Sequence, residues 1–280
     1  MISVIMPTHR KPPMLRLTLL SVLSQDYDDF ELIVVDASND GYFKDEFERL
    51  MKDDHLLVWY SHKKKNVKIL RPEENCQLPG AMKMYGFRNS VQDNGFCIFL
   101  DHDDFLWGNT LKNIHNATYG HSDYDMVGMD YTSMVYIDGN VFTNKETYVG
   151  GEVCGSTDTI YIDRFYFKFS GQQDIYRNKH PFKSAMHPKI ISKQALRDNR
   201  FAFVEDTETM DDCAFAIMSH ALKEVYIYAI GYVYVGYYNS NSTSGRKVSE
   251  RARKIMDDSN IYGSMLSEMG YVKHRDVYVP

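Results

Sequence analysis

The sequence predicts an α/β fold in which a mainly parallel sheet is flanked by helices. The first observation is a set of short, continuous apolar runs at residues 2–6, 31–36 and 95–100, a pattern typical of strands that are covered on both faces. The second is the helical spacing of leucine and valine at residues 15–23. Strand, helix and strand at this spacing form a right-handed βαβ unit. Such sheets collect ligand-binding groups in the loops at the carboxyl ends of their strands.

Length and composition limit the class of protein. The 280 residues are 44% hydrophobic, which allows one large α/β domain or two joined lobes. The net charge of −6 argues against broad, non-specific nucleic-acid binding. The four cysteines are scattered without a Cys-x-x-Cys pair, so neither a disulfide framework nor a zinc site is predicted, and a reducing, cytoplasmic location is expected. There is no run of about 18 apolar residues, so no membrane span is predicted.

The remaining elements of the N-terminal half follow from the same signals. Pro12 and Pro13 open the first helix, because proline is well tolerated in a first turn. Residues 61–71 are rich in Lys and Arg and are predicted to be a solvated loop, with a phosphate or acceptor contact as the alternative. The other expected elements are a charged helix at 43–54, a strand at 56–60, a helix from 80 to about 92 and a helix at 106–119.

The C-terminal half is predicted to be less regular. Asp211 and Asp212 precede an apolar stretch that is expected to be helical as far as residue 222, and acidic residues are favourable at the start of a helix. The other expected elements are short aromatic strands within 126–170, a strand and a short helix at 187–196, a strand at 225–237 and a charged helical tail from 246.

The chemical signal is strongest directly after the third apolar run, at Asp101-His102-Asp103-Asp104. Carboxylates this close repel one another, so a cluster that is poor in water requires a cation or a proton. A hard divalent ion takes oxygen ligands and leaves positions open for phosphate oxygens. The alternative is a strand-to-helix turn in which Asp103 or Asp104 caps the next helix. Together with the other motifs, the cluster favours a metal site.

Polar residues also follow the first two strands. Asp36 ends the second strand and can accept a hydrogen bond from a base or a ribose, the alternative being an Asx turn. Thr8, His9 and Arg10 follow the first strand, which neighbours the second in a parallel sheet. Arg10 is equally compatible with a plain surface charge.

Four segments in this order resemble the GT-A fold glycosyltransferases of family 2. The likeness is good over residues 1–110 and thin beyond. It implies a mainly parallel, Rossmann-like sheet flanked by helices, with a fused acceptor-side lobe. It also implies metal-dependent transfer of a sugar, with inversion, from a nucleotide sugar to an acceptor hydroxyl. The four segments are SVIMPTHR at 3–10, SVLSQ at 21–25, ELIVVD at 31–36 and FLDHDD at 99–104.

The resemblance also implies roles for individual residues. Thr8 and Asp36 would hold the base, usually uracil, although the family's Asp-Gly or Asp-Asp is here Asp36-Ala37. Asp101 would contact the ribose or the sugar, and Asp103 would ligate Mn²⁺ or Mg²⁺ on the diphosphate. The family's Ala-Arg-Asn-x-Gly segment is altered here, which leaves open whether Lys83 or Arg88 faces the phosphates. The donor-binding candidates are therefore Pro7, Thr8, Arg10, Asp36, Lys83, Arg88, Asp101 and His102, for which a loop role is the alternative, and the metal ligand is Asp103.

A later Glu-Asp pair supplies the general base in the family that the chain resembles. Two acidic pairs are candidates here, Glu205-Asp206 and Asp211-Asp212. We expect the base to be Asp212, because this pair precedes the apolar stretch and stands at about the expected distance from the later asparagine-rich segment. Asp206 is the second choice, and helix-start acids without a catalytic role are the alternative for both pairs.

The resemblance divides the chain into a nucleotide-sugar-binding half at 1–110, an acceptor-binding half of the same domain at 111–245 and a helical tail at 246–280. The implied donor is a UDP-sugar, and the acceptor is a glycan, a lipid-linked sugar, a protein or, less favoured by the charge, a nucleic acid. A nucleotidyltransferase is one alternative, but residues 7–13 lack the glycine-rich loop that such enzymes usually carry. A non-catalytic nucleotide- or sugar-binding module is the other.

Overall fold

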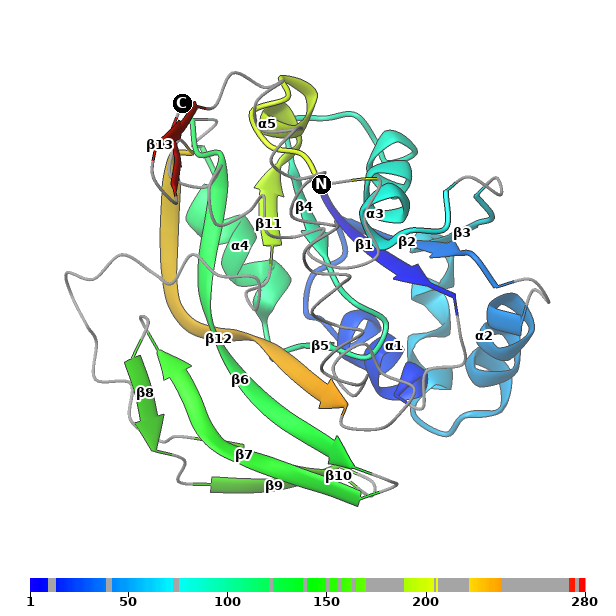
Figure 1. The fold of residues 1–280 in the computed structure, drawn as a ribbon. Coiled ribbons are helices and arrows are strands. Elements are labelled where there is room, and N and C mark those ends of the chain that lie inside the picture. The colour runs from blue at the N-terminus through cyan, green and yellow to red at the C-terminus, as the bar shows by residue number, and fades with distance from the viewer. Residues whose placement is uncertain are drawn as a thin grey trace, which may run out of the picture.

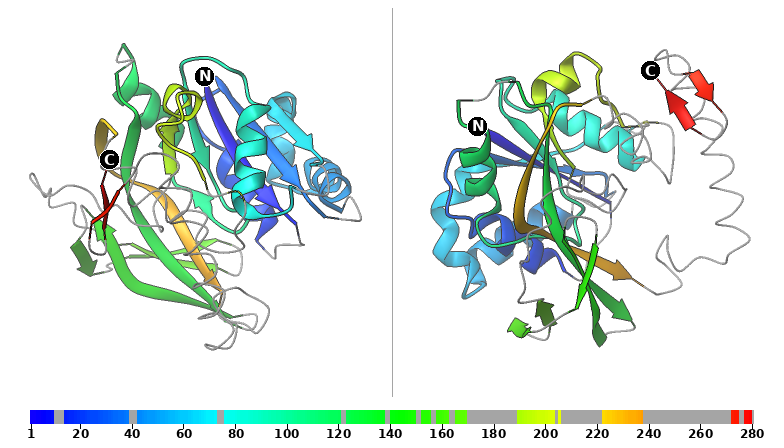
Figure 2. Two further views of the ribbon diagram at one scale, coloured as in Figure 1. Left: turned by 45° about the horizontal axis from the view of Figure 1, so that its top comes forward. Right: turned by 90° about the vertical axis from the view of Figure 1, so that its left-hand side faces the viewer.

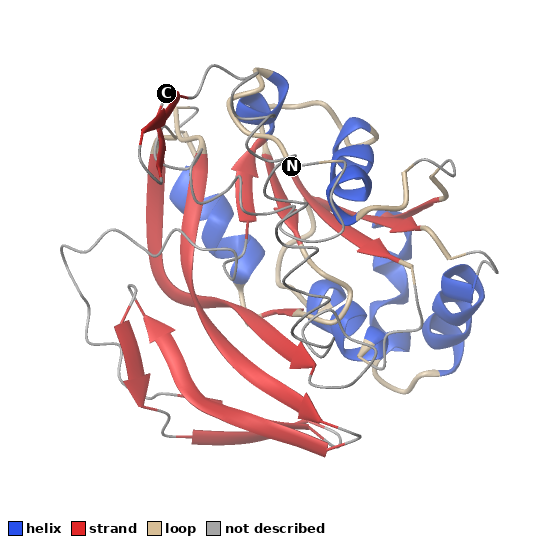
Figure 3. Cartoon of the chain, viewed as in Figure 1, coloured by secondary structure: helices blue, strands red, loops and turns tan. Residues whose placement is uncertain are grey.

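The sheet at the centre of the protein has two halves of different character (Figures 1 and 3). The computed structural model describes residues 1–9, 14–38, 42–72, 76–120, 123–137, 140–149, 152–155, 158–162, 165–169, 189–203, 205, 222–237, 272–274 and 277–279. Within the described chain the strand order is β3-β2-β1-β4-β11-β6-β12-β5.

The N-terminal half of the sheet is wholly parallel. Strand β1 pairs with β2 on one side and with β4 on the other, and β2 pairs with β3. The continuous apolar runs therefore form covered parallel strands, as their composition predicts. The elements of this half are β1 (Ile2–Thr8), α1 (Leu15–Leu23), β2 (Phe30–Asp36), α2 (Tyr42–Asp53), β3 (Val67–Leu70), α3 (Pro79–Arg88) and β4 (Phe96–Phe99).

The other half of the sheet is mixed. Strand β11 is antiparallel to both β4 and β6, whereas β6 and β12 are parallel to each other. The short strand β5 lies at the edge and pairs with β12. The elements are β5 (Phe105–Leu106), α4 (Thr110–Thr118), β6 (Met126–Ile137), β7 (Asn140–Val149), β8 (Glu152–Gly155), β9 (Asp158–Ile162), β10 (Phe165–Phe169), β11 (Lys189–Ser192), α5 (Lys193–Arg197), β12 (Glu224–Tyr237), β13 (Val272–His274) and β14 (Val277–Val279).

Two apolar cores lie on opposite faces of the parallel strands, because successive side chains of a strand point to opposite sides. Val4 and Met6 of β1 belong to the larger core, under α1, α2 and α4. Ile5 belongs to the second core, under α3 and α5. Figure 2 shows α3 on the opposite face from α1 and α2. The predicted α/β class, a parallel sheet between helical layers, is confirmed.

One segment differs from its prediction. Instead of a strand at 56–60 and a solvated loop, the chain forms a 3₁₀ helix, η1 (Leu57–Asn66). This helix is kinked at Tyr60, whose backbone is not helical, and Leu57 and Lys63, one on each side of the kink, are both buried. The Lys63 ammonium group donates to the Gln25 carbonyl (2.5 Å) and pairs with Asp28 (3.2 Å). One lysine of the basic run is therefore buried and bonded within the fold.

Two further boundaries differ from prediction. Phe105 and Leu106 pair with β12, so α4 begins only at Thr110 instead of at residue 106. At the C-terminus, the described residues of the predicted helical tail form the β13–β14 hairpin, because β-branched and aromatic residues there favour strand pairing. None of the helices in the described ranges is long and apolar enough to span a bilayer.

Candidate functional site

The loop at residues 101–104 lies at the carboxyl ends of the parallel strands. It leaves β4 at the centre of the sheet and enters β5 at the edge (Figure 1). The Leu100 amide donates to the Ile5 carbonyl (3.0 Å), and the Asp104 amide donates to the Asp101 carbonyl (3.0 Å) to close a turn. The acidic cluster is thus held where α/β sheets bind ligands.

Neighbouring elements fix the backbone of this loop. The Thr18 hydroxyl of α1 donates to the His102 carbonyl (2.9 Å). The His102 ring places Nδ1 3.2 Å from the Pro7 carbonyl, so that the loop is joined to the end of β1. The His102 ring also lies near that of His9, with centroids 6.3 Å apart. The donor-binding candidates Pro7 and His102 are therefore brought together, with His102 in a contact that positions the loop.

Asp104 is buried, and its carboxylate accepts a hydrogen bond from within the protein. Its exposed fraction is 1%, and the Tyr232 hydroxyl of β12 donates to its Oδ2 atom. Burial and the negative charge of Asp104 raise the pKa of Tyr232, so the phenol keeps the proton it donates. The cap of α4 is Asn109, and the alternative in which Asp103 or Asp104 caps that helix is wrong.

Asp103 and Asp101 face a different environment. Burial raises the pKa of Asp103 and the charge of Asp101 raises it further, while His102 and Lys83 act in the opposite direction. The Asp101 side chain is 46% exposed, and Asp103 keeps part of its surface accessible. A cation placed beside Asp103 would favour its ionised form.

The two basic candidates on α3 have different partners. The ammonium group of Lys83 is buried, 3.4 Å from Asp101 Oδ1 and 5.2 Å from the centre of the Phe203 ring. Arg88, one turn and a half further along the helix, is exposed and forms a two-point ion pair with Glu205. The structure therefore places Lys83, and not Arg88, beside the acidic loop.

Asp36 carries a buried oxygen that lacks a partner. The residue is 2% exposed. Its Oδ1 atom accepts from the Ser38 amide (3.0 Å) and the Ser38 hydroxyl (2.6 Å), as in the predicted Asx turn. Its Oδ2 atom has no hydrogen-bond partner among the described residues. Thr8 lies directly opposite in the β1–β2 pairing. A buried carboxylate oxygen without a donor is costly, and a ligand N–H group would satisfy it.

Asp36 lines a pocket of about 380 Å³ between α2 and β3. Of its basic residues, Lys44 was not a sequence candidate, and Arg71 was covered only by the alternative phosphate or acceptor contact of the 61–71 run. Arg71 comes directly after β3, so the rule that located Asp36 after β2 would also have located Arg71. It was missed because β3 was not recognised within the supposed loop. The lining residues are Asp36, Lys44, Phe47, Glu48, Lys64, Val67, Ile69 and Arg71.

Several candidates fall on residues that lie outside the described ranges. These are Arg10, Asp206, Asp211 and Asp212. Asp212 as the base, and Asp206 as the second choice, therefore stay predictions. The division of the chain into halves at residue 110 also stays a prediction. The sheet is continuous between these halves, because β4 from the first lies beside β11 from the second.

The carboxylates of the acidic loop suit a divalent cation whose remaining ligands are phosphate oxygens. Within the described ranges, no group of three or more His, Cys, Asp or Glu side chains is arranged to hold a metal alone. Mg²⁺ and similar ions are usually held by one or two carboxylates together with substrate phosphates. Asp103, which is partly accessible, and Asp101, which is 46% exposed, offer two such carboxylates.

Comparisons with known proteins agree with this geometry. The profile of Glycosyl transferase family 2 matches residues 3–144, half of the chain, which include β1 to β4 and the acidic loop. Succinoglycan biosynthesis protein ExoW of Rhizobium meliloti (strain 1021) is 25% identical over 198 residues, which are 70% of this chain and 49% of ExoW. The GalNAc(5)-diNAcBac-PP-undecaprenol beta-1,3-glucosyltransferase of Campylobacter jejuni is 26% identical over 177 residues, 61% of this chain and 49% of that protein.

The fold also resembles that of a solved structure. The structure of S. aureus TarS 1-349 in complex with UDP-GlcNAc aligns with a TM-score of 0.60 at 19% identity, covering 88% of this chain and 61% of that one. The chain spans about half the length of the curated relatives it matches. The predicted GT-A architecture is thereby confirmed at the level of the fold.

Proposed function

The chain belongs to glycosyl transferase family 2, and from this premise we propose that it transfers a sugar from a UDP-sugar to an acceptor hydroxyl. The observation that carries the proposal is the buried, unpartnered Oδ2 atom of Asp36. Asp36 lies at the carboxyl end of β2. The acidic loop follows the carboxyl end of β4, so both lie at the same edge of the sheet. A base at Asp36 and a diphosphate at Asp101 and Asp103 would span the two strand ends.

Uracil suits Asp36 because of its hydrogen-bonding pattern. The Ser38 amide fixes Oδ1 as an acceptor, so Oδ2 would serve as the second acceptor for a base bound in the pocket that Asp36 lines. Uracil offers an N3–H donor between two carbonyl groups, whereas cytosine has a lone pair at N3. Arg71 and Lys44 in the same pocket can donate to the uracil carbonyls. The UDP-GlcNAc complex of TarS is consistent with this choice of nucleotide.

The diphosphate belongs at the acidic loop in this proposal. Asp103 would ligate Mn²⁺ or Mg²⁺, with Asp101 toward the ribose or the sugar, and the bound cation would neutralise charge on the leaving nucleotide. Lys83, held beside Asp101 at 3.4 Å, would add a fixed positive charge. The Tyr232 hydroxyl keeps Asp104 within the fold, so that the loop presents the other two acids outward.

The acceptor side completes the mechanism. A hydroxyl group is a poor nucleophile near neutral pH, and Asp212 would remove its proton as the new bond forms. Attack from the face opposite the leaving group would invert the anomeric centre. The acceptor we propose is a hydroxyl of a glycan, which is consistent with the names of both curated relatives. A cytoplasmic location remains part of the proposal; Cys76 and Cys97 are buried and form no disulfide within the part of the chain that the structure describes.

The test changes Asp36 to asparagine. The Ser38 amide would retain the asparagine carbonyl at the Oδ1 position, and the new NH₂ group would then point into the pocket. We expect Asp36→Asn to weaken Mn²⁺-dependent UDP binding at least tenfold and to reduce the preference for UDP over CDP, because the amide can donate to cytosine N3. Titration calorimetry with both nucleotides measures this, and the exposed acid Asp45, as Asp45→Asn, provides the matched control.

Two results would count against the proposal. The first is that the wild-type protein binds no uridine nucleotide with Mn²⁺ or Mg²⁺ present. The second is that Asp36→Asn and Asp45→Asn bind UDP and CDP equally well. Release of UDP from a panel of UDP-sugars then identifies the donor sugar, and a raised melting temperature with one of them gives an independent measure of binding.

A further inference from the structure

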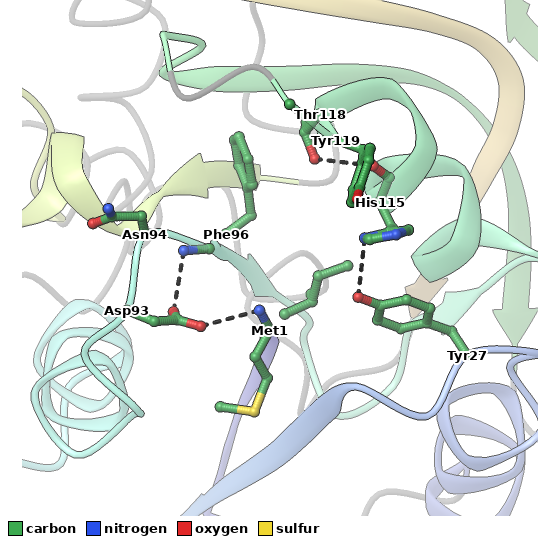
Figure 4. Close-up of a pocket in the computed structure, with 11 residues that line it drawn as sticks. Met1, Tyr27, Asp93, Asn94, Phe96, His115, Thr118 and Tyr119 are labelled. Atoms are coloured by element: carbon green, nitrogen blue, oxygen red, sulfur yellow. Dashed lines mark hydrogen bonds and ion pairs between the residues drawn. The ribbon is translucent and has the colours of Figure 1, made fainter.

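A second pocket opens at the opposite end of the parallel strands. It lies where β1 and β4 begin, next to the last turn of α4, and has a volume of about 480 Å³ (Figure 4), within the usual range for small-molecule sites. The seven residues of β1 place it on the order of 20 Å from the acidic loop. No part of the proposed transfer reaction uses it.

Aromatic rings form one wall of this pocket. His115 lies in the last turn of α4 and Tyr119 directly follows the helix. Their ring centroids are 5.3 Å apart, and Tyr27 continues the row at 5.2 Å from His115. The Tyr27 hydroxyl lies 3.3 Å from His115 Nδ1, which fixes the two rings relative to each other. Tyr119 is 74% exposed, which is unusual for so large a ring, and it offers a flat platform to a ligand.

Polar side chains stand across from the rings, with Met1 and Phe96 between the two walls (Figure 4). Asp93 is held by Lys193 (2.7 Å). Burial alone would raise the pKa of Asp93, but hydrogen bonds from Lys193 and other donors lower it, so this carboxylate stays charged. The Asn94 carbonyl oxygen accepts from Arg197 (3.1 Å), which leaves its NH₂ group to donate elsewhere. The wall therefore offers both an acceptor and a donor.

These two walls select a class of ligand. One wall is aromatic and the other carries hydrogen-bonding side chains. A ligand that contacts both walls therefore needs one apolar face and a polar rim. The charges on this wall are balanced, because Asp93 and Asp29 pair with the terminal amino group (3.0 and 3.3 Å) and Asp93 also pairs with Lys193 (2.7 Å). The wall therefore has no excess positive charge that would favour a phosphate or another anion. A neutral pyranose ring has an apolar C–H face and a rim of hydroxyl groups.

We propose that this pocket is a second carbohydrate-binding site, which takes a neutral hexose unit of an oligosaccharide, with its ring face on Tyr119 and its hydroxyl groups toward Asp93 and Asn94. The choice of a sugar over another neutral ring rests on the proposed function. At this distance from the acidic loop, the bound unit is a remote part of an acceptor or product chain and not the sugar being transferred. The site thus adds binding without contributing to the chemical step.

The test uses neutral oligosaccharides of glucose, galactose and N-acetylglucosamine, four to six units long, with saturation-transfer NMR and calorimetry. We expect at least one of them to bind the wild-type protein in the absence of nucleotide. Tyr119→Ala should weaken this binding at least fivefold, whereas Tyr119→Phe, which keeps the ring, should retain it. Trp59→Ala is the matched control, because Trp59 is an aromatic residue of similar exposure (76%) that does not line this pocket.

The outcomes separate this site from the donor site. If no oligosaccharide binds, or if Tyr119→Ala binds as tightly as Trp59→Ala, the second site is refuted, whatever the result with UDP. If binding depends on Tyr119 while Asp36→Asn shows no change in nucleotide binding, the second site stands and the proposed donor site fails. Thermal unfolding of each variant checks that Tyr119→Ala remains folded, and Tyr119→Phe provides the conservative comparison.

Discussion

The three acids of the 101–104 loop differ in environment although they are nearly adjacent in sequence. Asp104 is bound to Tyr232 inside the protein, Asp101 is half exposed beside Lys83, and Asp103 has a pKa raised by burial. Identical side chains thereby acquire different roles, since burial and neighbouring charges decide which carboxylate can attract a cation. Asp104 joins the loop to β12, whereas Asp101 and Asp103 keep part of their surface accessible.

The first residue-scale prediction separates binding from chemistry. Asp103→Asn should abolish metal-dependent donor binding, because an amide is a weaker ligand for a hard cation than a carboxylate. Asp212→Asn should leave donor binding intact and reduce transfer by a factor of about 10² to 10⁴, the range for a general base. Calorimetry with UDP and Mn²⁺, and turnover with a UDP-sugar, measure the two effects. Normal turnover by Asp212→Asn would refute the choice of base, and Asp206→Asn is then the next variant.

The second residue-scale prediction concerns Tyr232. Tyr232→Phe removes the hydroxyl that donates to buried Asp104, and a buried group that loses a hydrogen bond costs about 1–3 kcal/mol. We expect a loss of that size in the free energy of unfolding, measured with urea, and a several-fold weaker affinity for UDP with Mn²⁺ because the loop is less well positioned.

The control for this change is Tyr60→Phe. Tyr60 is partly buried in η1, and its hydroxyl has no hydrogen bond to other described residues. If Tyr232→Phe loses stability but binds UDP normally, Tyr232 supports the fold and does not position the loop.

At the scale of the elements, Asp54 joins three parts of the chain. Its carboxylate accepts from Arg16 of α1 and from the amides of Leu56 (2.9 Å) and Leu57 (3.0 Å) at the start of η1. Burial alone would raise the pKa of Asp54, but these hydrogen bonds outweigh it and lower the pKa to about 2. The position of η1, and with it Lys64 on the wall of the Asp36 pocket, therefore depends on a charged side chain.

The lowered pKa gives the stability a defined pH dependence. A carboxyl group with a pKa of about 2 when folded and about 3.9 when unfolded stabilises the fold fully above about pH 4, and this contribution is lost as the pH falls through about 2. Asp54→Asn keeps an acceptor oxygen but loses the charge, so it should reduce the free energy of unfolding by about 1–2 kcal/mol at pH 7.

Urea unfolding between pH 7 and pH 2.5 measures this prediction. The difference between Asp54→Asn and the wild-type protein should shrink below about pH 4. The neighbouring exposed acid, changed as Asp53→Asn, is the control. A difference that stays constant over the whole pH range would show that Asp54 acts through its shape and not through its charge.

At the scale of the whole molecule, the geometry of the proposed donor site depends on how closely the α3 layer packs on the sheet. A Cβ atom at Gly86 would lie 2.5 Å from Ile5 Cγ2 and 3.1 Å from Val35 Cγ2, so the glycine permits the close approach. The same helix carries Lys83, whose ammonium group lies 3.4 Å from Asp101 Oδ1 at this spacing. The contact between layers is thus linked to the electrostatics of the site.

Gly86→Ala tests this link. Overpacking costs about 1–3 kcal/mol, and the better helix propensity of alanine returns up to about 1 kcal/mol, so we expect a net loss of about 1 kcal/mol in unfolding free energy together with weaker UDP binding. Ile5→Leu moves the methyl branch away from Cβ and should recover part of both losses in the double variant. If Gly86→Ala is as stable as the wild-type protein and binds UDP equally well, the close packing is not required.

The sequence by itself determined the α/β class and the positions of the chemically important strand ends. Apolar runs and helical spacing are local properties, and the rule that parallel strands present their loops at one edge converts them into a site that contains Asp36 and Asp101–Asp104. The same rule would have located Arg71 if β3 had been recognised. The 3₁₀ segment was missed because short 3₁₀ turns on either side of a kink, with a buried lysine, leave no strong signal in the sequence.

Only the tertiary structure decided which side chains meet. Tyr232 and Asp104 are 128 residues apart in sequence, Arg88 pairs with Glu205 while Lys83 faces Asp101, and the pocket at the start of β1 joins four segments of the chain. The physical reason is the range of the forces. Backbone preferences act over a few residues, whereas burial, ion pairing and cavity shape depend on the strand order that brings distant segments together.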